Sequence, residues 1–217
     1  MENLIKIFGS KCKGLEILML LKGFKPVVRQ GFYEEELEEV ESFCKENHIF
    51  LIKSNFKVLL EGVEFSNKGL KVSVDDPGSG IVFVYLSKDE SKANKAAYFE
   101  NQGDHKGLGG ALSYPDCCTT FFDKYEPNMS KLDNNYEVPL VEESPGNAFS
   151  FYNNVFLRHK DYCLLSHFPC NINCEKSLSM AKKNFEVLKE NNPEMAQDFI
   201  ENLKGELIVN DRKINFI

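Results

Sequence analysis

Two short segments of the chain hold most of the residues whose types and spacing could do chemistry. Residues 113–118 read SYPDCC and residues 166–174 read SHFPCNINC. In each segment a proline precedes the cysteines, and an amphipathic helix is expected to begin beside them, since proline is favoured at helix starts. The candidate metal ligands are Cys117, Cys118, Cys170 and Cys174, with His167 as an alternate ligand.

Cysteines at the start of a helix are suited to metal binding or to nucleophilic attack. The helix N-terminus carries a partial positive charge and unpaired N–H groups, which lower the pKa of a nearby thiol and favour the thiolate. Cys117 and Cys118 are adjacent, so on a helix their side chains point about 100° apart. Two readings stay open: both bind one centre, or one binds it while the other packs in the core.

The pattern leaves the cofactor undecided between an iron–sulfur cluster and zinc. Four thiolates suit either an iron–sulfur cluster or a structural zinc ion. Three cysteines with His167 suit zinc or a cluster with one unusual ligand. We therefore predict a metal- or iron–sulfur-binding protein whose reaction is not specified by the motif.

Two other functions fit the same residues. In the first, the protein is a thiol-dependent enzyme with Cys170 or Cys174 as nucleophile and His167 as base. In the second, it is an interaction protein that zinc stabilises without catalysis. If the protein is an enzyme, His105 and His167 are the candidates for moving protons, because an ordinary histidine titrates near a pKa of about 6.5.

The two cysteine segments, together with Gly109-Gly110-Ala111-Leu112 before the first and Glu175-Lys176-Ser177 after the second, resemble the archaeal DUF483 family of uncharacterised proteins. The resemblance covers residues ~100–190. It implies which residues form the motif and implies no activity. Ser113 stands where the family pattern leads us to expect a glycine, a departure that affects the turn before the proline.

Composition narrows the class of partner. The chain has 217 residues, a net charge of −7, and 42% hydrophobic residues. Because phosphate contacts dominate nucleic-acid affinity, this acidic balance disfavours nucleic acid and leaves an unidentified small molecule or protein as partner. We see no apolar stretch of membrane-spanning length and no signal-peptide pattern, so we expect a cytoplasmic location, where thiols are reduced.

Helices and strands must position these residues, and the helices and strands expected from the sequence indicate an α+β or α/β fold. We expect an α/β unit at 1–87 packed on a mostly helical region at 88–217, with one continuous domain as the alternative. Helices are predicted at 33–47, 89–101, 147–159, 174–191 and from Pro193 onward. Strands are predicted at 26–28, 49–53, 56–60 and 81–86, the last of them central, and a hairpin over 206–217. Residues 127–148 are predicted to form a long loop.

Several other residues receive a structural interpretation. Glycines 103–110 are expected to allow close packing of a helix beside Cys117. Cys12 and Cys44 are expected in the core, and Cys163 is a reserve ligand near the site. Helix capping is the expected role of Ser87, Asp116, and one of Asn171 and Asn173.

Overall fold

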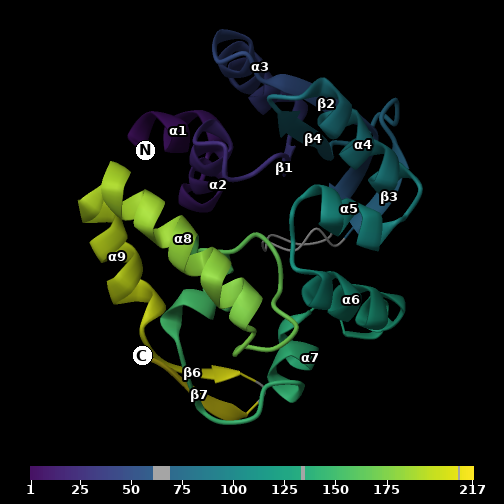
Figure 1. The fold of residues 1–217 in the computed structure, drawn as a ribbon. Helices are drawn as coiled ribbons and strands as arrows, with labels where there is room; N and C mark the ends of the chain where they lie inside the picture. Colours follow the sequence, from purple (N-terminus) through teal and green to yellow (C-terminus); the bar gives the residue numbers. More distant parts are fainter. Residues whose placement is uncertain (61–68, 133–134, 210) are drawn as a thin grey trace.

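The computed structural model describes residues 1–60, 69–132, 135–209 and 211–217. Figure 1 shows a sheet with helices against it in one half and a group of helices with a second, smaller sheet in the other half. The first half contains α1 (Glu2–Phe8), α2 (Lys11–Leu21), β1 (Val28–Phe32), α3 (Leu37–Glu46), β2 (Phe50–Leu60), β3 (Gly69–Ser73), β4 (Ile81–Ser87), α4 (Glu90–Asn101) and α5 (His105–Ala111). The second contains α6 (Asp116–Tyr125), α7 (Glu137–Glu142), β5 (Ala148–Phe149), α8 (Glu175–Asn191), α9 (Pro193–Leu203), β6 (Gly205–Val209) and β7 (Arg212–Phe216).

The larger sheet has the strand order β1-β4-β2-β3, and its three pairings are antiparallel. The predicted central position of the 81–86 strand is confirmed, because β4 lies between β1 and β2 and all seven of its residues are buried. The two strands predicted at 49–53 and 56–60 form the single strand β2, with an irregularity between Lys53 and Lys57.

Side chains alternate between the two faces of β4, and each face has its own core. Val84 and Leu86 belong to the larger core, which also contains residues of α1, α2, α3, α8 and α9. Phe83 and Tyr85 belong to a smaller core covered by the alanines of α4. The predicted mixed α+β fold is thus confirmed, while the boundary at residue 87 stays a prediction.

The helix predicted at 147–159 is wrong. In its place β5 pairs in parallel with β7, and a 3-10 turn follows at Phe151–Asn153. The aromatic side chains of this segment pack against distant partners: Phe149 lies near Phe216, and Phe151 lies near Phe185.

The long loop predicted at 127–148 is also partly wrong. The 3-10 segment Glu126–Leu132 and helix α7 occupy much of it, while 133 and 134 lie outside the described residues. The predicted C-terminal hairpin is confirmed by the antiparallel pairing of β6 with β7, and Asn210 between them is likewise outside the described part.

The three predicted helix caps are wrong: Ser87 does not cap α4, Asp116 does not cap α6, and neither asparagine caps α8. Helix α4 is capped by Asp89, whose side chain accepts a hydrogen bond from the Lys92 amide, and not by Ser87. Ser87 Oγ instead donates to the Pro26 carbonyl and accepts from the Asp89 amide. At α8 the N-cap is Cys174, so neither Asn171 nor Asn173 caps that helix.

Candidate metal centre

Helix α6 presents the first pair of cysteines at its N-terminus. Pro115, with φ −59°, precedes the helix, and Cys117 and Cys118 lie in the first turn as the sequence predicted. Asp116 is the first helical residue and not the cap. The thiols therefore lie where unpaired backbone N–H groups and the helix dipole stabilise negative charge.

Close packing of α5 fixes the position of α6. Gly109 is buried, and a Cβ atom built on it would lie 2.2 Å from Cγ2 of Thr119. Glycine is therefore required for the two helices to approach this closely. The predicted role of the glycine-rich stretch, close packing of a helix beside the Cys117 segment, is confirmed.

The second cysteine segment is irregular, and buried polar side chains hold its backbone. Asn153 Nδ2 donates to the Ile172 carbonyl at 2.9 Å, and Ser144 Oγ accepts from the Ile172 amide at 2.7 Å. Asn184 Nδ2 donates to the Leu164 carbonyl at 2.7 Å. These three side chains replace the hydrogen bonds that a helix or sheet would supply, so this stretch of loop has a defined conformation.

Four thiols meet between the starts of α6 and α8. The sulfurs of Cys117, Cys118, Cys170 and Cys174 all lie within 4.8 Å of one another. The Cys117–Cys174 and Cys118–Cys174 sulfur distances are 3.7 Å, and the Cys117–Cys118 distance is 3.9 Å. Both members of the adjacent pair thus face one point, and the four cysteines are close enough to bind a metal ion.

Donors from the protein surround these sulfurs. The Cys170 amide donates to Cys118 Sγ at 3.3 Å, and Ser177 Oγ lies 3.2 Å from the same sulfur. Asn171 Nδ2 lies 3.7 Å from Cys170 Sγ. Hydrogen bonds of this kind stabilise thiolates and orient metal ligands.

Among Cys118, Cys170 and Cys174, the thiol of Cys174 ionises most readily without metal. A hydrogen bond from Cys118, together with those from Ser177, lowers the pKa of Cys174 to about 4. The same hydrogen bond, with burial, raises the pKa of Cys118 far above its usual range. Burial and the charge at Cys174 raise the pKa of Cys170 to about 12. Thiolates at Cys118 and Cys170 in addition to Cys174 therefore need a cation between them.

His167 lies beside the cluster without joining it. Its Nε2 is 2.9 Å from Ser177 Oγ, so it reaches Cys118 only through that hydroxyl. Burial, reinforced by the positive charges of Lys25 and Arg158, lowers the pKa of His167 to about 3. Within the described part of the chain its Nδ1 is buried without a partner. The ring is therefore neutral near pH 7, and its role as a base stays a prediction.

His105 lies on α5, where its ring packs against Phe122 and its Nε2 is 3.8 Å from Glu126. It contributes no atom to the four-thiol cluster, and its proposed role in proton transfer stays a prediction.

The remaining cysteines lie outside the cluster. Cys44 is buried in the larger core and Cys12 packs against that core. Cys163 is buried too, but its thiol donates to the Leu165 carbonyl at 2.9 Å, and Cys12 Sγ lies 3.5 Å from the Cys163 carbonyl. The cluster of described residues therefore does not include the predicted reserve ligand.

Sequence reasoning missed the supporting residues Ser144, Asn153 and Ser177. Ser177 carried a usable signal, since it follows Cys174 by three positions and a residue there lies one helical turn from the N-cap. Ser144 and Asn153 carried none, because their partner, the backbone of Ile172, lies 28 and 19 residues further along the chain.

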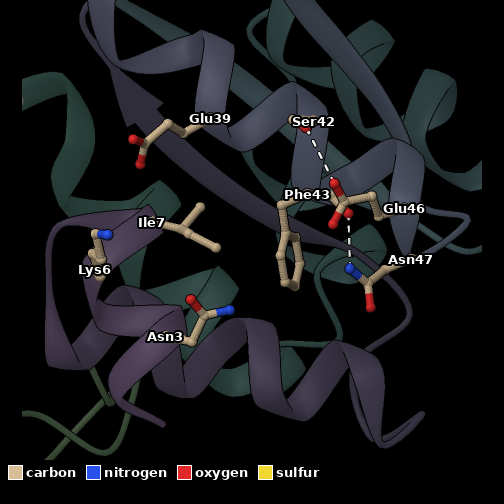
Figure 2. Close-up of a pocket in the computed structure, with 8 residues that line it drawn as sticks. All are labelled: Asn3, Lys6, Ile7, Glu39, Ser42, Phe43, Glu46 and Asn47. Carbon is tan, nitrogen blue, oxygen red and sulfur yellow. Dashed lines mark hydrogen bonds between the residues drawn. The ribbon is translucent and has the colours of Figure 1, made fainter.

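A hollow of about 410 Å³ lies on the surface between α1 and α3 (Figure 2). Its lining includes Lys6, Glu39 and Ser42, and Figure 2 shows Ser42 bonded to Glu46 one turn along α3. These four side chains are exposed, and the lining contains no cysteine or histidine. The hollow is therefore unrelated to the thiol cluster.

Among the described residues, none of the helices combines the length and apolar character that crossing a bilayer requires. No family model, curated protein or solved structure matches this chain. The four-cysteine cluster is therefore the feature of the described structure from which a function can be inferred.

Proposed function

We propose that the protein binds one zinc ion through Cys117, Cys118, Cys170 and Cys174, and that this ion ties α6 to the start of α8. The observation that carries the proposal is the sulfur spacing: the sulfurs of Cys117, Cys118 and Cys174 are 3.7 to 3.9 Å apart, and that of Cys170 lies within 4.8 Å of each of them. A Zn–S bond of about 2.3 Å in a tetrahedral site places the sulfurs about 3.8 Å apart. The thiols are thus spaced for a single metal ion at their centre.

The same spacing argues against the iron–sulfur alternative. In a cluster of several irons the thiolates bind different iron atoms, so their sulfurs are spread further apart than around one ion. Four thiolates also leave no open coordination position, which is the arrangement of structural zinc sites. On this proposal the metal stabilises the fold, and the centre itself catalyses no reaction.

Charge supports an anionic metal centre here. Zinc with four thiolates has a net charge of −2, and the cations Lys25 and Arg158 lie close enough to depress the pKa of His167. Together with the two helix N-termini, these cations offset the charge that the site would carry.

The experiment is metal and sulfide analysis with an absorption spectrum on anaerobically purified protein. We expect about one zinc per chain, no sulfide, and loss of the zinc in a Cys170→Ala, Cys174→Ala variant. The matched control is Cys44→Ala, which removes a buried thiol outside the cluster and should keep its zinc. Iron together with sulfide and visible absorption would show that the site holds an iron–sulfur cluster and not zinc. A wild-type protein that holds no metal would refute the proposal.

A thiol enzyme is the second candidate, favoured by the depressed pKa of Cys174. Against a Cys–His pair, the described hydrogen bonds of His167 include none to a cysteine, and Cys174 is buried. Rapid alkylation of Cys174 at pH 6 in protein as purified would favour the enzyme. Protection of that thiol until the metal is removed would favour zinc.

A further inference from the structure

A second cavity is lined in part by Leu164, Leu165 and Ser166, the residues just before His167. It has a volume of about 230 Å³ and is enclosed by α2, β1 and residues 158–166. Tyr114 and Ser166 line it, and the Tyr114 ring lies 4.9 Å from the His167 ring. The cavity is smaller than a typical site for a drug-sized ligand, so it suits a ligand of a few heavy atoms.

Four cationic side chains line this cavity: Lys13, Lys25, Arg29 and Arg158. This concentration is unexpected in a chain with a net charge of −7. Burying positive charge is unfavourable unless an anion or strong acceptors compensate it. The partners of each cation therefore indicate what the cavity lacks.

Two of the cations have carboxylate partners. Lys25 forms an ion pair with Glu16 and donates to Ser166 Oγ at 2.6 Å. Arg29 forms a two-pronged ion pair with Glu100. These two cations are electrostatically satisfied by the protein.

The other two cations bond only neutral groups within the described residues. Lys13 Nζ donates to the Gly31 carbonyl at 2.8 Å and lies over the Phe32 ring. Arg158 donates through Nη2 to the Leu165 carbonyl at 2.9 Å. Each keeps unused N–H donors, since an ammonium offers three and a guanidinium five.

The remaining carboxylate on the cavity wall, Asp161, does not pair with either cation at salt-bridge distance in the described structure. It accepts hydrogen bonds from Ser10 Oγ and from the amides of Lys11 and Cys12, at 2.5, 2.6 and 3.0 Å. Lys13 and Arg158 are therefore the two cations of this cavity without a carboxylate at salt-bridge distance among the described residues, and the carboxylates of Glu36 and Asp161 act on Lys13 from further away.

An acceptor on the same wall is also without a partner. Gln30 is 4% exposed, and its Nε2 donates to the Lys13 carbonyl at 3.0 Å. Its Oε1 is buried and makes no hydrogen bond within the described part of the chain. A buried acceptor of this kind is unfavourable until a donor reaches it.

We propose that this cavity binds a small hydroxyl-bearing anion, with its carboxylate or phosphate oxygens on Lys13 and Arg158 and its hydroxyl donating to Gln30. The charge and the unpaired acceptor are both satisfied by such a ligand. The volume admits inorganic phosphate or a short hydroxycarboxylate. The proposal does not depend on which metal, if any, the cysteines bind.

The test uses two matched pairs of anions in isothermal titration calorimetry with the full chain. Phosphate and glycolate carry a hydroxyl group at pH 7, whereas sulfate and acetate do not. We expect saturable binding with one site and a Kd of about 1 mM or tighter for phosphate or glycolate. The matching anion without a hydroxyl should bind at least about tenfold more weakly, because Gln30 Oε1 then stays unpaired.

The diagnostic variant is Lys13→Met, which removes one cation that has no salt bridge among the described residues and retains the aliphatic side chain. It should weaken binding at least about tenfold, the effect of one lost charge-assisted hydrogen bond, and Lys13→Arg should restore most of the affinity. The control is Lys189→Met on α8, an exposed lysine outside the cavity lining, with affinity unchanged. The Lys13→Met protein should keep wild-type metal content, so this proposal and the zinc proposal fail separately.

Two results would overturn the proposal. One is the absence of saturable binding of all four anions at tens of millimolar. The other is binding that Lys13→Met and Lys189→Met weaken equally, which would indicate a general attraction to surface cations.

Discussion

Substituting Gly109 by alanine tests whether the contact between α5 and α6 positions the first two cysteines. The added Cβ would lie 2.2 Å from Cγ2 of Thr119 and 3.2 Å from its Cβ. Overpacking of this kind typically costs about 1–3 kcal/mol. Alanine in a helix offsets this by at most about 1 kcal/mol. We therefore expect a net destabilisation of about 1–2 kcal/mol, or a fall in Tm of about 2–8 °C for a chain of this size.

The neighbouring Gly110 supplies a matched control. It lies in the same helix, is exposed, and has nothing within 4 Å of a Cβ built on it. Gly110→Ala should therefore raise stability by about 0.5–1 kcal/mol through helix propensity. Opposite signs at adjacent positions would separate the steric effect from the propensity effect.

A third variant removes the atom responsible. Thr119→Ser deletes Cγ2 and keeps the hydroxyl that donates to the Asp116 carbonyl at 2.9 Å. In a double-mutant cycle measured by urea unfolding, Gly109→Ala should cost clearly less in the serine background. If Gly109→Ala is neutral, or if its cost is the same in both backgrounds, the packing argument is refuted.

Three further outcomes are expected. Removing zinc with a chelator should lower the Tm by about 8–16 °C, because a metal present at about 1,000 times its Kd stabilises the fold by about 4 kcal/mol. The Tm of the Cys170→Ala, Cys174→Ala variant should not change on addition of the chelator. Because His167 has a folded pKa of about 3, below that of the unfolded chain, its contribution to stability is complete above about pH 6.5. That contribution should fall by about 1.4 kcal/mol per pH unit on acidification toward pH 3. The measurement is the pH dependence of the free energy of unfolding, compared between the wild type and His167→Gln. Glu100→Gln should lower the free energy of unfolding, measured by denaturant titration, by about 2–3 kcal/mol, because it leaves the largely buried Arg29 unpaired. Glu206→Gln breaks an exposed ion pair and should cost under about 0.5 kcal/mol.

The local features of the site were predictable from sequence because they depend on nearby residues. Pro115 and Pro169 precede the cysteines; α6 begins beside Cys117 as expected, and α8 begins at Glu175, one residue after the predicted start. The buried strand β4 was equally predictable, because a continuous apolar run between turn signals is typical of a central strand. Each of these predictions uses information from a window of about ten residues.

The failures involve residues whose partners are far away in the chain. Asn154 Nδ2 donates to the Leu203 carbonyl, 49 residues further along, and this bond helps to fix an irregular conformation where a helix was predicted at 147–159. The sulfurs of Cys118 and Cys174 are 3.7 Å apart although the two residues are 56 positions apart in the sequence. The spacing of the cysteines along the chain does not predict this contact. Propensity and periodicity do not carry such information, since tertiary contacts override them.

The proposed zinc centre and the proposed anion cavity share their electrostatic support. Lys25 and Arg158 lower the pKa of His167 beside the cysteines, and both line the cavity. A zinc tetrathiolate would draw on the positive potential of these two cations, whereas Lys13 lines the cavity from α2 and is not among the charges that act on His167. Anion binding should therefore depend more on Lys13 than on Lys25, whose ion pair with Glu16 is already complete. The anion affinities of the Lys13→Met and Lys25→Met proteins should therefore be compared. A larger loss of affinity in Lys13→Met indicates a ligand bound in the cavity, whereas equal losses indicate an ion attracted to the whole basic region.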